Sequence, residues 1–172
     1  MGDVRTAEGI TPSAAEQVRR GLSRLVKAAV VVTAWHQGQR WATTATAVSE
    51  LGMAPPSLLV CLDNTIDPHP PLTTGAYFCI NILHAGQLAV SRSCSGDETG
   101  EARFAEGRWG SGACGTPYLC DAQASFICEV EDYIDRGAHA ILIGTVMEMH
   151  LWGEVDPLIY VGDSHARVAG LA

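Results

Sequence analysis

The sequence predicts one mainly β domain, a barrel or sandwich of six or seven short strands with a few flanking helices. Its 172 residues fit a single domain, because domains average about 150 residues. Short apolar and β-branched runs recur roughly 8–15 residues apart with turn residues between them, a pattern typical of barrels and sandwiches. Strands and helices do not alternate regularly, which argues against a doubly wound parallel sheet.

The composition excludes several other classes of protein. Hydrophobic residues make up 47% of the chain and charged residues 17%, whereas a disordered chain is poor in the first and rich in the second. Acidic residues outnumber basic residues by 19 to 11, which argues against a nucleic-acid-binding surface. No apolar run approaches the roughly 18 residues of a membrane-spanning helix. We therefore expect neither a nucleic-acid partner nor a membrane association.

The N-terminal residues indicate a cytoplasmic protein. Residues 1–11 are predicted to form a loose polar arm without a signal peptide, and residues 12–172 to form the domain. Gly2 and Thr6 fit a myristoylation pattern. We interpret this as a chance match, because no polybasic patch or second lipid signal follows.

The six cysteines favour reduced thiols over disulfides or a metal site. They include no Cys-x-x-Cys pair, and no histidine stands at zinc-ligand spacing. Three of them lie in apolar runs and are predicted to be small buried residues, namely Cys61, Cys79 and Cys128. The other three stand in looser stretches, namely Cys94, Cys114 and Cys120.

The first part of the domain predicts a helix followed by a hairpin. Ser13 and Glu16 fit a capping box at a helix start, and apolar residues then recur on one helical face. The valine-rich run 30–35 is typical of a strand. Residues 36–39 supply a glycine turn, and the chain returns as a second strand over residues 41–48.

The rest of the chain continues mainly as strands. Further strands are predicted over residues 57–62, 77–83, 124–134, 140–149 and 158–161. Short helices are predicted over residues 87–93 and 98–105, on either side of a Gly-Asp loop. Residues 107–117 are predicted to be irregular.

Two chemical motifs have a simpler structural reading. Gly110 to Gly115 match Gly-x-Gly-x-x-Gly, but neither an apolar strand before the run nor a helix after it is predicted, so we interpret it as a surface loop. His139 stands at the head of a strand, where residue type alone favours a satisfied edge residue over a ligand contact at a barrel mouth. Spacing leaves a Ser/His/Asp triad open, but the chain has no Gly-x-Ser-x-Gly elbow for a serine nucleophile.

The strand 41–48 is unusually small and rich in hydroxyl groups. Its residues Thr43, Thr44, Ala45 and Thr46 fit a solvated edge, or a surface where backbone amides and hydroxyls approach a flat or anionic ligand. Residues 61–65 follow a buried strand as a polar turn, and free amides in such a turn can form an anion-binding nest.

The order of these segments resembles the flavin reductase-like family. The run 42–48 is followed by Pro55 to Asp63, His69-Pro70, Phe78 to Leu83 and Gln87. The resemblance continues through Arg103-Phe104, Gly115 to Pro117, Gly137 to His139, Ile143 to Val146 and Pro157 to Tyr160, and covers about residues 20 to 168. It is most similar to the small reductase components of two-component aromatic hydroxylases such as 4-hydroxyphenylacetate 3-monooxygenase. The resemblance implies an FMN-binding split β-barrel.

The resemblance also implies the residues of a flavin site. Flavin contacts carry over to Thr44, Ala45, Thr46 and Ala47, and to Cys61, Leu62, Asp63, Asn64 and Thr65. Asn81 and Arg92 match positions that line the same pocket, with Arg92 the candidate counter-charge for the phosphate. His139 matches a Gly-x-His that lies beside the nicotinamide. Two departures, Cys94 and His165, stand where the family usually has aromatic residues.

The implied activity is hydride transfer from NADH or NADPH to FMN or FAD. The reduced flavin would pass to a flavin-dependent monooxygenase component, and the reductase would be a homodimer whose second subunit completes the site. Two alternatives remain open from the residues alone. One is a flavin- or haem-binding split barrel without reductase turnover, and the other is a structural barrel that only resembles the family.

Overall fold

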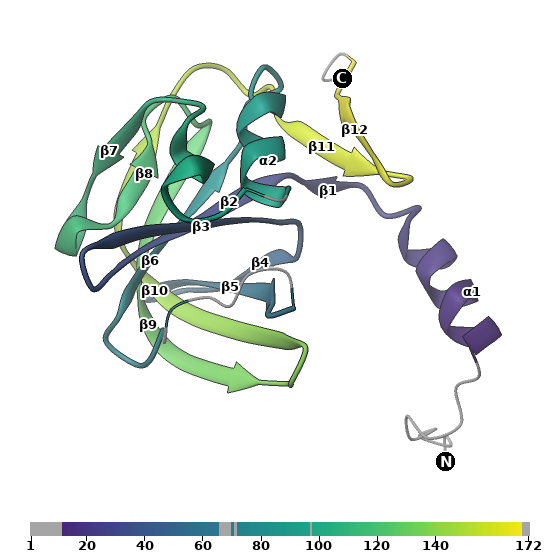
Figure 1. The fold of residues 1–172 in the computed structure, drawn as a ribbon, viewed down its shortest axis with the longest axis horizontal. Helices are drawn as coiled ribbons and strands as arrows, with labels where there is room; N and C mark the ends of the chain where they lie inside the picture. Colours follow the sequence, from purple (N-terminus) through teal and green to yellow (C-terminus); the bar gives the residue numbers. More distant parts are fainter. Residues whose placement is uncertain (1–11, 66–69, 71, 97, 170–172) are drawn as a thin grey trace.

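A seven-stranded antiparallel sheet forms the body of the protein. The structure is a computed structural model that describes residues 12–65, 70, 72–96 and 98–169, so the predicted arm 1–11 and His69 lie outside the described residues. The strands are ordered β3-β2-β6-β9-β10-β5-β4 (Figure 1). Their bounds are β2 Val30–His36, β3 Gln39–Ala45, β4 Val48–Met53, β5 Pro56–Asp63, β6 Tyr77–Ile82, β9 Ala124–Asp135 and β10 His139–Leu151.

The sheet curls into a barrel, and its two edge strands, β3 and β4, follow one another in the chain. β3 ends at Ala45 and β4 begins at Val48, and the Cys61 amide donates to the Ala47 carbonyl at 2.9 Å. Alternate side chains of the strands therefore fill one interior. The buried interior residues are Val30, Val32, Ala34, Val60, Leu62, Leu72, Phe78, Ile80, Cys128, Val130 and Leu142. The predicted mainly β barrel is confirmed, with seven strands in its main sheet.

A second apolar layer covers the outside of β2 and β3. It contains helix α2 (Leu88–Ser95), the short 3-10 helix η2 (Gly100–Phe104) and the hairpin of β7 (Trp109–Ser111) and β8 (Pro117–Leu119). Val31 and Ala42 face this layer from the barrel and pack among its buried residues. The other buried members are Ala29, Leu83, Val90, Cys94, Phe104, Leu119, Ala122 and Leu158. The barrel wall is thus buried on both faces here.

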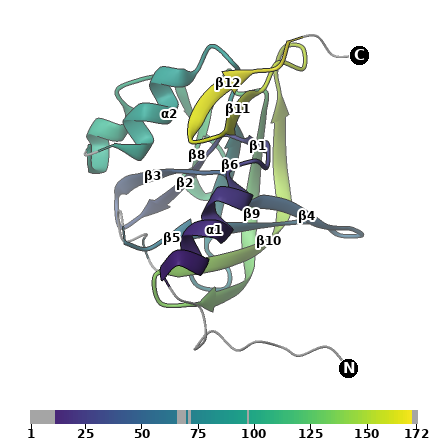
Figure 2. The same cartoon turned by 90° about the vertical axis from the view of Figure 1, so that its right-hand side faces the viewer.

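The N- and C-terminal segments meet beside the barrel. Strand β1 (Lys27–Ala28) pairs with β11 (Leu158–Val161), which pairs with β12 (Ser164–Arg167). Helix α1 (Pro12–Leu22) precedes them and stands away from the barrel (Figure 1). Seen from the side, α1 lies in front of β4 and β5, with β11 and β12 above it (Figure 2). None of the helices within the described residues has the length and apolar character needed to cross a membrane.

Several sequence expectations need correction. The helix predicted to begin near Ser13 is present as Pro12–Leu22, but its apolar face is exposed. Strands β1, β4, β7, β8 and β12 were not predicted. The glycine-rich run Gly110 to Gly115 contains the end of β7 and a three-residue 3-10 helix, η3 (Ala113–Gly115). β8 follows it directly, so the run does not lead into the helix that a dinucleotide loop requires.

The cysteines pack differently from the prediction at two positions. All six are free thiols, as expected. Cys79 and Cys128 are buried as predicted, but Cys61 is half-buried on the outer face of β5. Cys94, predicted to lie in a looser stretch, is completely buried against the second layer. Burial raises the pKa of the Cys94 and Cys128 thiols to about 12, so both stay protonated and act as small apolar residues.

Candidate functional site

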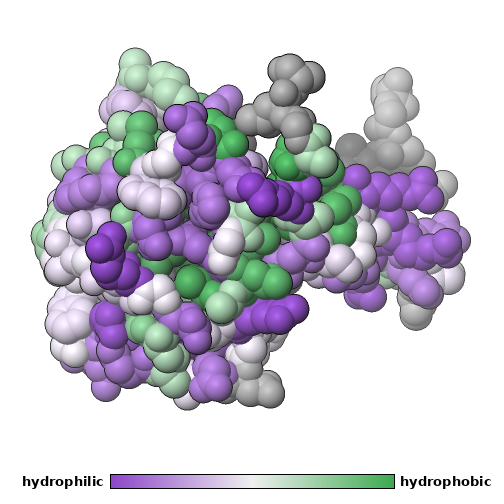
Figure 3. Space-filling view, turned by 90° about the horizontal axis from the view of Figure 1, so that it is seen from above, coloured by the Kyte–Doolittle hydropathy of each residue, from purple (hydrophilic) through white to green (hydrophobic). Residues whose placement is uncertain are grey.

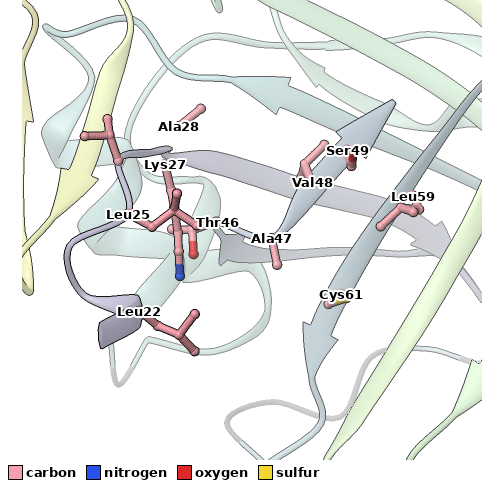
Figure 4. A pocket seen from close by; sticks show the side chains of 11 residues that line it. Leu22, Leu25, Lys27, Ala28, Thr46, Ala47, Val48, Ser49, Leu59 and Cys61 are labelled. Carbon is pink, nitrogen blue, oxygen red and sulfur yellow. The ribbon is translucent and has the colours of Figure 1, made fainter. Parts of the chain in front are cut away.

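A cavity of about 500 Å³ opens where the chain passes from β3 to β4. We call it the apolar cavity. Leu22 and Leu25 lie on one side, Leu59 and Cys61 on the other, and Ala47 between them (Figure 4). The remaining lining residues are Val26, Lys27, Ala28, Thr46, Val48 and Ser49. Its volume lies within the range of small-molecule sites, roughly 300–1,000 Å³.

Strand alternation explains which side chains reach this cavity. Successive residues of a strand point to opposite faces, so Leu59 and Cys61 face outward while Val60 and Leu62 fill the barrel. Ala47 lies in the two-residue connection between β3 and β4, outside both strands. The Ala47 side chain is small and lines the apolar cavity at this point.

A second cavity of about 390 Å³ adjoins the first. We call it the polar cavity. Thr46 lines both cavities. The other residues that line the polar cavity are Thr44, Ala45, Ser95, Tyr160, Asp163 and His165. The Thr44 hydroxyl donates to the Ser91 carbonyl at 2.8 Å, which ties β3 to α2 at the cavity wall. The two cavities meet at Thr46, and we call them together the groove, with one apolar end and one polar end.

Positive charge stands beside the polar cavity. Arg92 lies on α2 with an exposed side chain, and the neighbouring Ser91 hydroxyl is 3.0 Å from Nε2 of His165. Burial lowers the pKa of His165, and the Arg92 charge lowers it further. The Arg92 guanidinium is therefore close enough to this ring to act on it electrostatically. A guanidinium near hydroxyl groups suits a phosphate or a carboxylate.

His139 lies on the outer face that also carries Cys61. It is the first residue of β10 and pairs in register with Asp63, while Ile141 pairs with Cys61. Directly opposed residues of antiparallel strands point to the same face. His139 is therefore on the face of Cys61 and stands two residues along the strands from it, roughly 7 Å from the cavity wall. The Thr65 hydroxyl and amide donate to the Asp63 carboxylate at 2.6 and 2.8 Å and lower its pKa. His139 lowers this pKa further.

Asn64 holds the loop that leads into β10. Its side-chain amide donates to the Gly137 carbonyl at 3.1 Å, and its backbone amide donates to the Ala138 carbonyl at 2.8 Å. These bonds fix the two residues before His139. The structure thus gives Asp63, Asn64 and Thr65 a role in shaping the end of β5 and the position of His139.

Two predicted residues lie away from the groove surface. Asn81 is completely buried, and its side chain bonds to protein groups of β2, β8 and β9. Leu62 is 1% exposed and packs in the barrel interior, so only its backbone is near the groove. The structure brings Thr44, Thr46, Ala47 and Cys61 together, with Arg92 and His139 at opposite ends.

The sequence did not indicate that residues of the N-terminal segment and Tyr160 line the groove. Leu22, Leu25 and Lys27 line the apolar cavity, and Tyr160 lines the polar cavity. The available signal was the helical repeat of apolar residues that begins at Val18, which usually marks a core-facing helix. Those residues instead form one side of an open groove.

Comparisons with known proteins identify the family and match the fold. The sequence profile described as "Flavin reductase like domain" matches residues 22–169. This chain belongs to the flavin reductase family. It is 34% identical to the FMN reductase (NADH) RutF of Variovorax paradoxus over 151 residues, covering 88% of this chain and 84% of that protein. The RutF of Stutzerimonas stutzeri is 32% identical over 160 residues, covering 93% and 92%.

Solved structures of the flavin reductase family share the fold. The NADH:FAD oxidoreductase SgcE6 of Streptomyces globisporus C-1027 has a TM-score of 0.83 and 26% identity, covering 97% of this chain and 100% of that chain. The flavin reductase HpaC complexed with NADP+ has a TM-score of 0.80 and 22% identity, covering 91% and 99%, a likeness of fold. The resemblance read from the sequence is confirmed.

Proposed function

We propose that this flavin reductase transfers hydride from NADH or NADPH to FMN or FAD. The observation that carries the proposal is the groove itself, with an apolar end for a flat ring system and a hydroxyl-rich end beside Arg92 for a phosphate. Relatives at 32–34% identity are named FMN reductase (NADH). A bound flavin supplies the hydride acceptor, and a nicotinamide supplies the hydride.

The donor set of the groove fits a flavin. Leu25, Ala47 and Leu59 present apolar surface to a ring. The Thr46 hydroxyl stands where the two cavities meet, and can bond the edge of the ring or the ribityl chain. The backbone groups of Thr46 lie outside the strands and can do the same, whereas the Ala47 carbonyl already accepts from the Cys61 amide. The protein's part is to orient the ring and exclude water from it.

Arg92 and the hydroxyls of α2 would hold the phosphate. A phosphate dianion needs a cation or several N–H and O–H donors nearby, and Arg92 supplies the first while Ser95 supplies a hydroxyl. This assignment predicts weaker binding of riboflavin, which lacks the phosphate.

His139 would position the nicotinamide. It faces the same side of the sheet as Cys61, at the end of the groove opposite Arg92, with the Asp63 carboxylate across from it. An imidazole there can bond a carboxamide or balance charge on the reduced flavin. The transfer itself needs no protein nucleophile.

A second copy of this chain would cover the groove. The side chains of Leu22, Leu25 and Val26 form one wall of the apolar cavity and are 54%, 57% and 58% exposed. Figure 3 shows hydrophilic side chains over the visible face of the protruding N-terminal segment, with apolar ones where it meets the barrel. Exposed apolar residues at a binding groove indicate a protein contact. Light scattering that finds a fully active monomer would contradict the homodimer.

The cellular role would be supply of reduced flavin to a monooxygenase in the cytoplasm. A groove on the outer face of the barrel allows flavin to enter and leave. SgcE6 is named as an NADH:FAD oxidoreductase, and BorF, at 24% identity, is named the flavin reductase component of a two-component tryptophan halogenase.

The test is anaerobic oxidation of NADH and NADPH with FMN, FAD or riboflavin added in turn. Turnover with FMN or FAD supports the proposal and ranks the nucleotides. A flavin that binds and shifts the melting temperature but is not reduced would point to the flavin- or haem-binding protein without turnover. No binding and no turnover would leave a structural barrel.

A further inference from the structure

His165 lines the polar end of the groove. It pairs in register with Tyr160, which pairs with Lys27, so three side chains form a row across β12, β11 and β1. Its ring meets Tyr160 edge-on, with 5.3 Å between ring centroids. Nε2 lies 3.0 Å from the hydroxyl of Ser91, a fully buried residue of α2. The ring is half-buried and lines the polar cavity.

Charged groups face this ring from several elements. Arg92 approaches from α2, and Lys27 stands in the same cross-strand row on β1. Asp163, in the turn between β11 and β12, is the acidic residue among those that line the polar cavity. Arg167, further along β12, pairs with Asp156 at 2.6 Å. The residues that β3 and its connection to β4 contribute to the polar cavity carry no charge, since they are Thr44, Ala45 and Thr46.

This environment disfavours a charged imidazole while the ligand is absent. Burial and the Arg92 charge both lower the pKa of His165 from its ordinary value of 6.5. A neutral imidazole has one N–H donor and one acceptor, whereas a protonated one donates from both nitrogens. Because Nε2 contacts Ser91, a neutral ring presents an N–H at Nδ1 in only one of its two tautomers. The charged ring always presents one.

We propose that His165 takes up a proton when a phosphate monoester dianion enters the polar cavity, and so makes the binding of phosphorylated flavin pH-dependent. The inference rests on the proposed flavin function and adds a proton-linked residue to it. Two negative charges would offset the repulsion from Arg92. The imidazolium would also compensate the Asp163 carboxylate, which otherwise opposes an anion in this cavity.

The sign of the effect follows from linkage. Because the ligand would raise the pKa of His165, the complex binds more protons than the free protein at pH values between the free and the bound pKa. Affinity for the phosphorylated ligand therefore increases as the pH falls through the bound pKa, and levels off below the free pKa. One linked proton changes affinity by at most about tenfold per pH unit.

The experiment compares FMN and riboflavin on wild-type protein and on His165→Gln. Flavin fluorescence titrations from pH 5.5 to 8.5 give dissociation constants. Calorimetry in two buffers of different ionisation enthalpy gives the protons taken up on binding. The FMN phosphate titrates near pH 6, but this contribution is common to both proteins and cancels in the comparison. His36→Gln is the matched control, since His36 lies at the opposite end of the β2–β3 hairpin from the groove.

We expect wild-type protein and His36→Gln to take up more protons with FMN than His165→Gln does, and equal numbers with riboflavin. Equal proton uptake with FMN in all three proteins would overturn this inference while the flavin function stands. A pH dependence shared by riboflavin would also overturn it. If neither flavin binds wild-type protein, the proposed function fails and this inference fails with it.

A direct measurement covers the case in which His165→Gln does not fold. The imidazole of His165 is titrated by NMR in the wild-type protein, with and without FMN. A pKa raised by FMN supports the proposal, and a pKa unchanged by saturating FMN refutes it. A purely structural histidine, which only joins β12 to α2 through Ser91, would show no change.

Discussion

Replacing Asn81 by alanine tests whether this residue supports the fold or contacts the ligand. Asn81 is completely buried. Its amide nitrogen donates to the Val31 carbonyl at 3.0 Å, and its oxygen accepts from the Leu119 amide at 2.8 Å and the Ser125 hydroxyl at 2.9 Å. One side chain therefore joins β2, β8 and β9. Its removal should loosen the contact between the barrel and the second layer.

The expected loss of stability follows from these three bonds. The Leu119 amide loses its acceptor in a buried place, which costs about 1–3 kcal/mol, and the other two bonds contribute about 1 kcal/mol each. Ser125 recovers part of its loss, because its hydroxyl also lies 3.3 Å from the Leu119 carbonyl. We expect Asn81→Ala to lower the free energy of unfolding by about 3 kcal/mol. For a chain of this size that is a fall in melting temperature of roughly 6–12 °C.

Urea denaturation and flavin titration together give the answer. Ser125→Ala is the control, since it removes one donor and leaves the Leu119 amide bonded to Asn81, and should cost about 1 kcal/mol or less. Asn81→Ala should keep the flavin dissociation constant within about twofold, measured below its melting temperature. A variant that keeps wild-type stability but binds flavin tenfold more weakly would refute the structural role and restore Asn81 to the binding site.

Three further predictions concern the groove and the barrel. Thr46→Val should raise the flavin dissociation constant about two- to tenfold with an unchanged melting temperature, because one hydroxyl bond is lost; an unchanged constant in fluorescence titration contradicts the placement. His139→Ala should raise the KM for nicotinamide or slow hydride transfer in stopped-flow, whereas wild-type values would remove it from the site. Gly144→Ala should lower stability by about 1–3 kcal/mol, because its Cβ would lie 2.7 Å from Phe78 and 2.8 Å from the Glu129 carbonyl; equal urea midpoints would argue otherwise.

The strands that the sequence predicted have strong local signals. β2, β6, β9 and β10 are apolar or alternate clearly, because one or both of their faces are buried. β4 was missed because most of its residues are exposed, which removes the alternation of polar and apolar side chains. Such a strand forms through its backbone pairing with β5, and that pairing depends on the barrel as a whole.

The candidate site was predictable only in part for a similar reason. Thr44 to Ala47 stand out in the sequence because a run of small and hydroxyl side chains is rare in a buried strand. The contribution of Leu22, Leu25 and Lys27 depends on where the N-terminal segment lies against β3 and β5, which no local pattern records. The repeat of apolar residues was read correctly as an amphipathic face, but the sequence did not show that this face would stay exposed.

The break between β3 and β4 explains why a groove exists at this point of the barrel. Earlier in β3, Ala42 packs in the second layer and Thr43 is buried, so that part of the strand has no free surface. At Ala45 the strand ends, and Thr46 and Ala47 turn the chain toward β4 without joining either strand. Backbone groups in a strand interior are used by their neighbours. In this connection the Ala47 carbonyl accepts from the Cys61 amide, and the side chain of Thr46 reaches both cavities. Thr46, which stands in this connection, therefore lines both the apolar and the polar cavity.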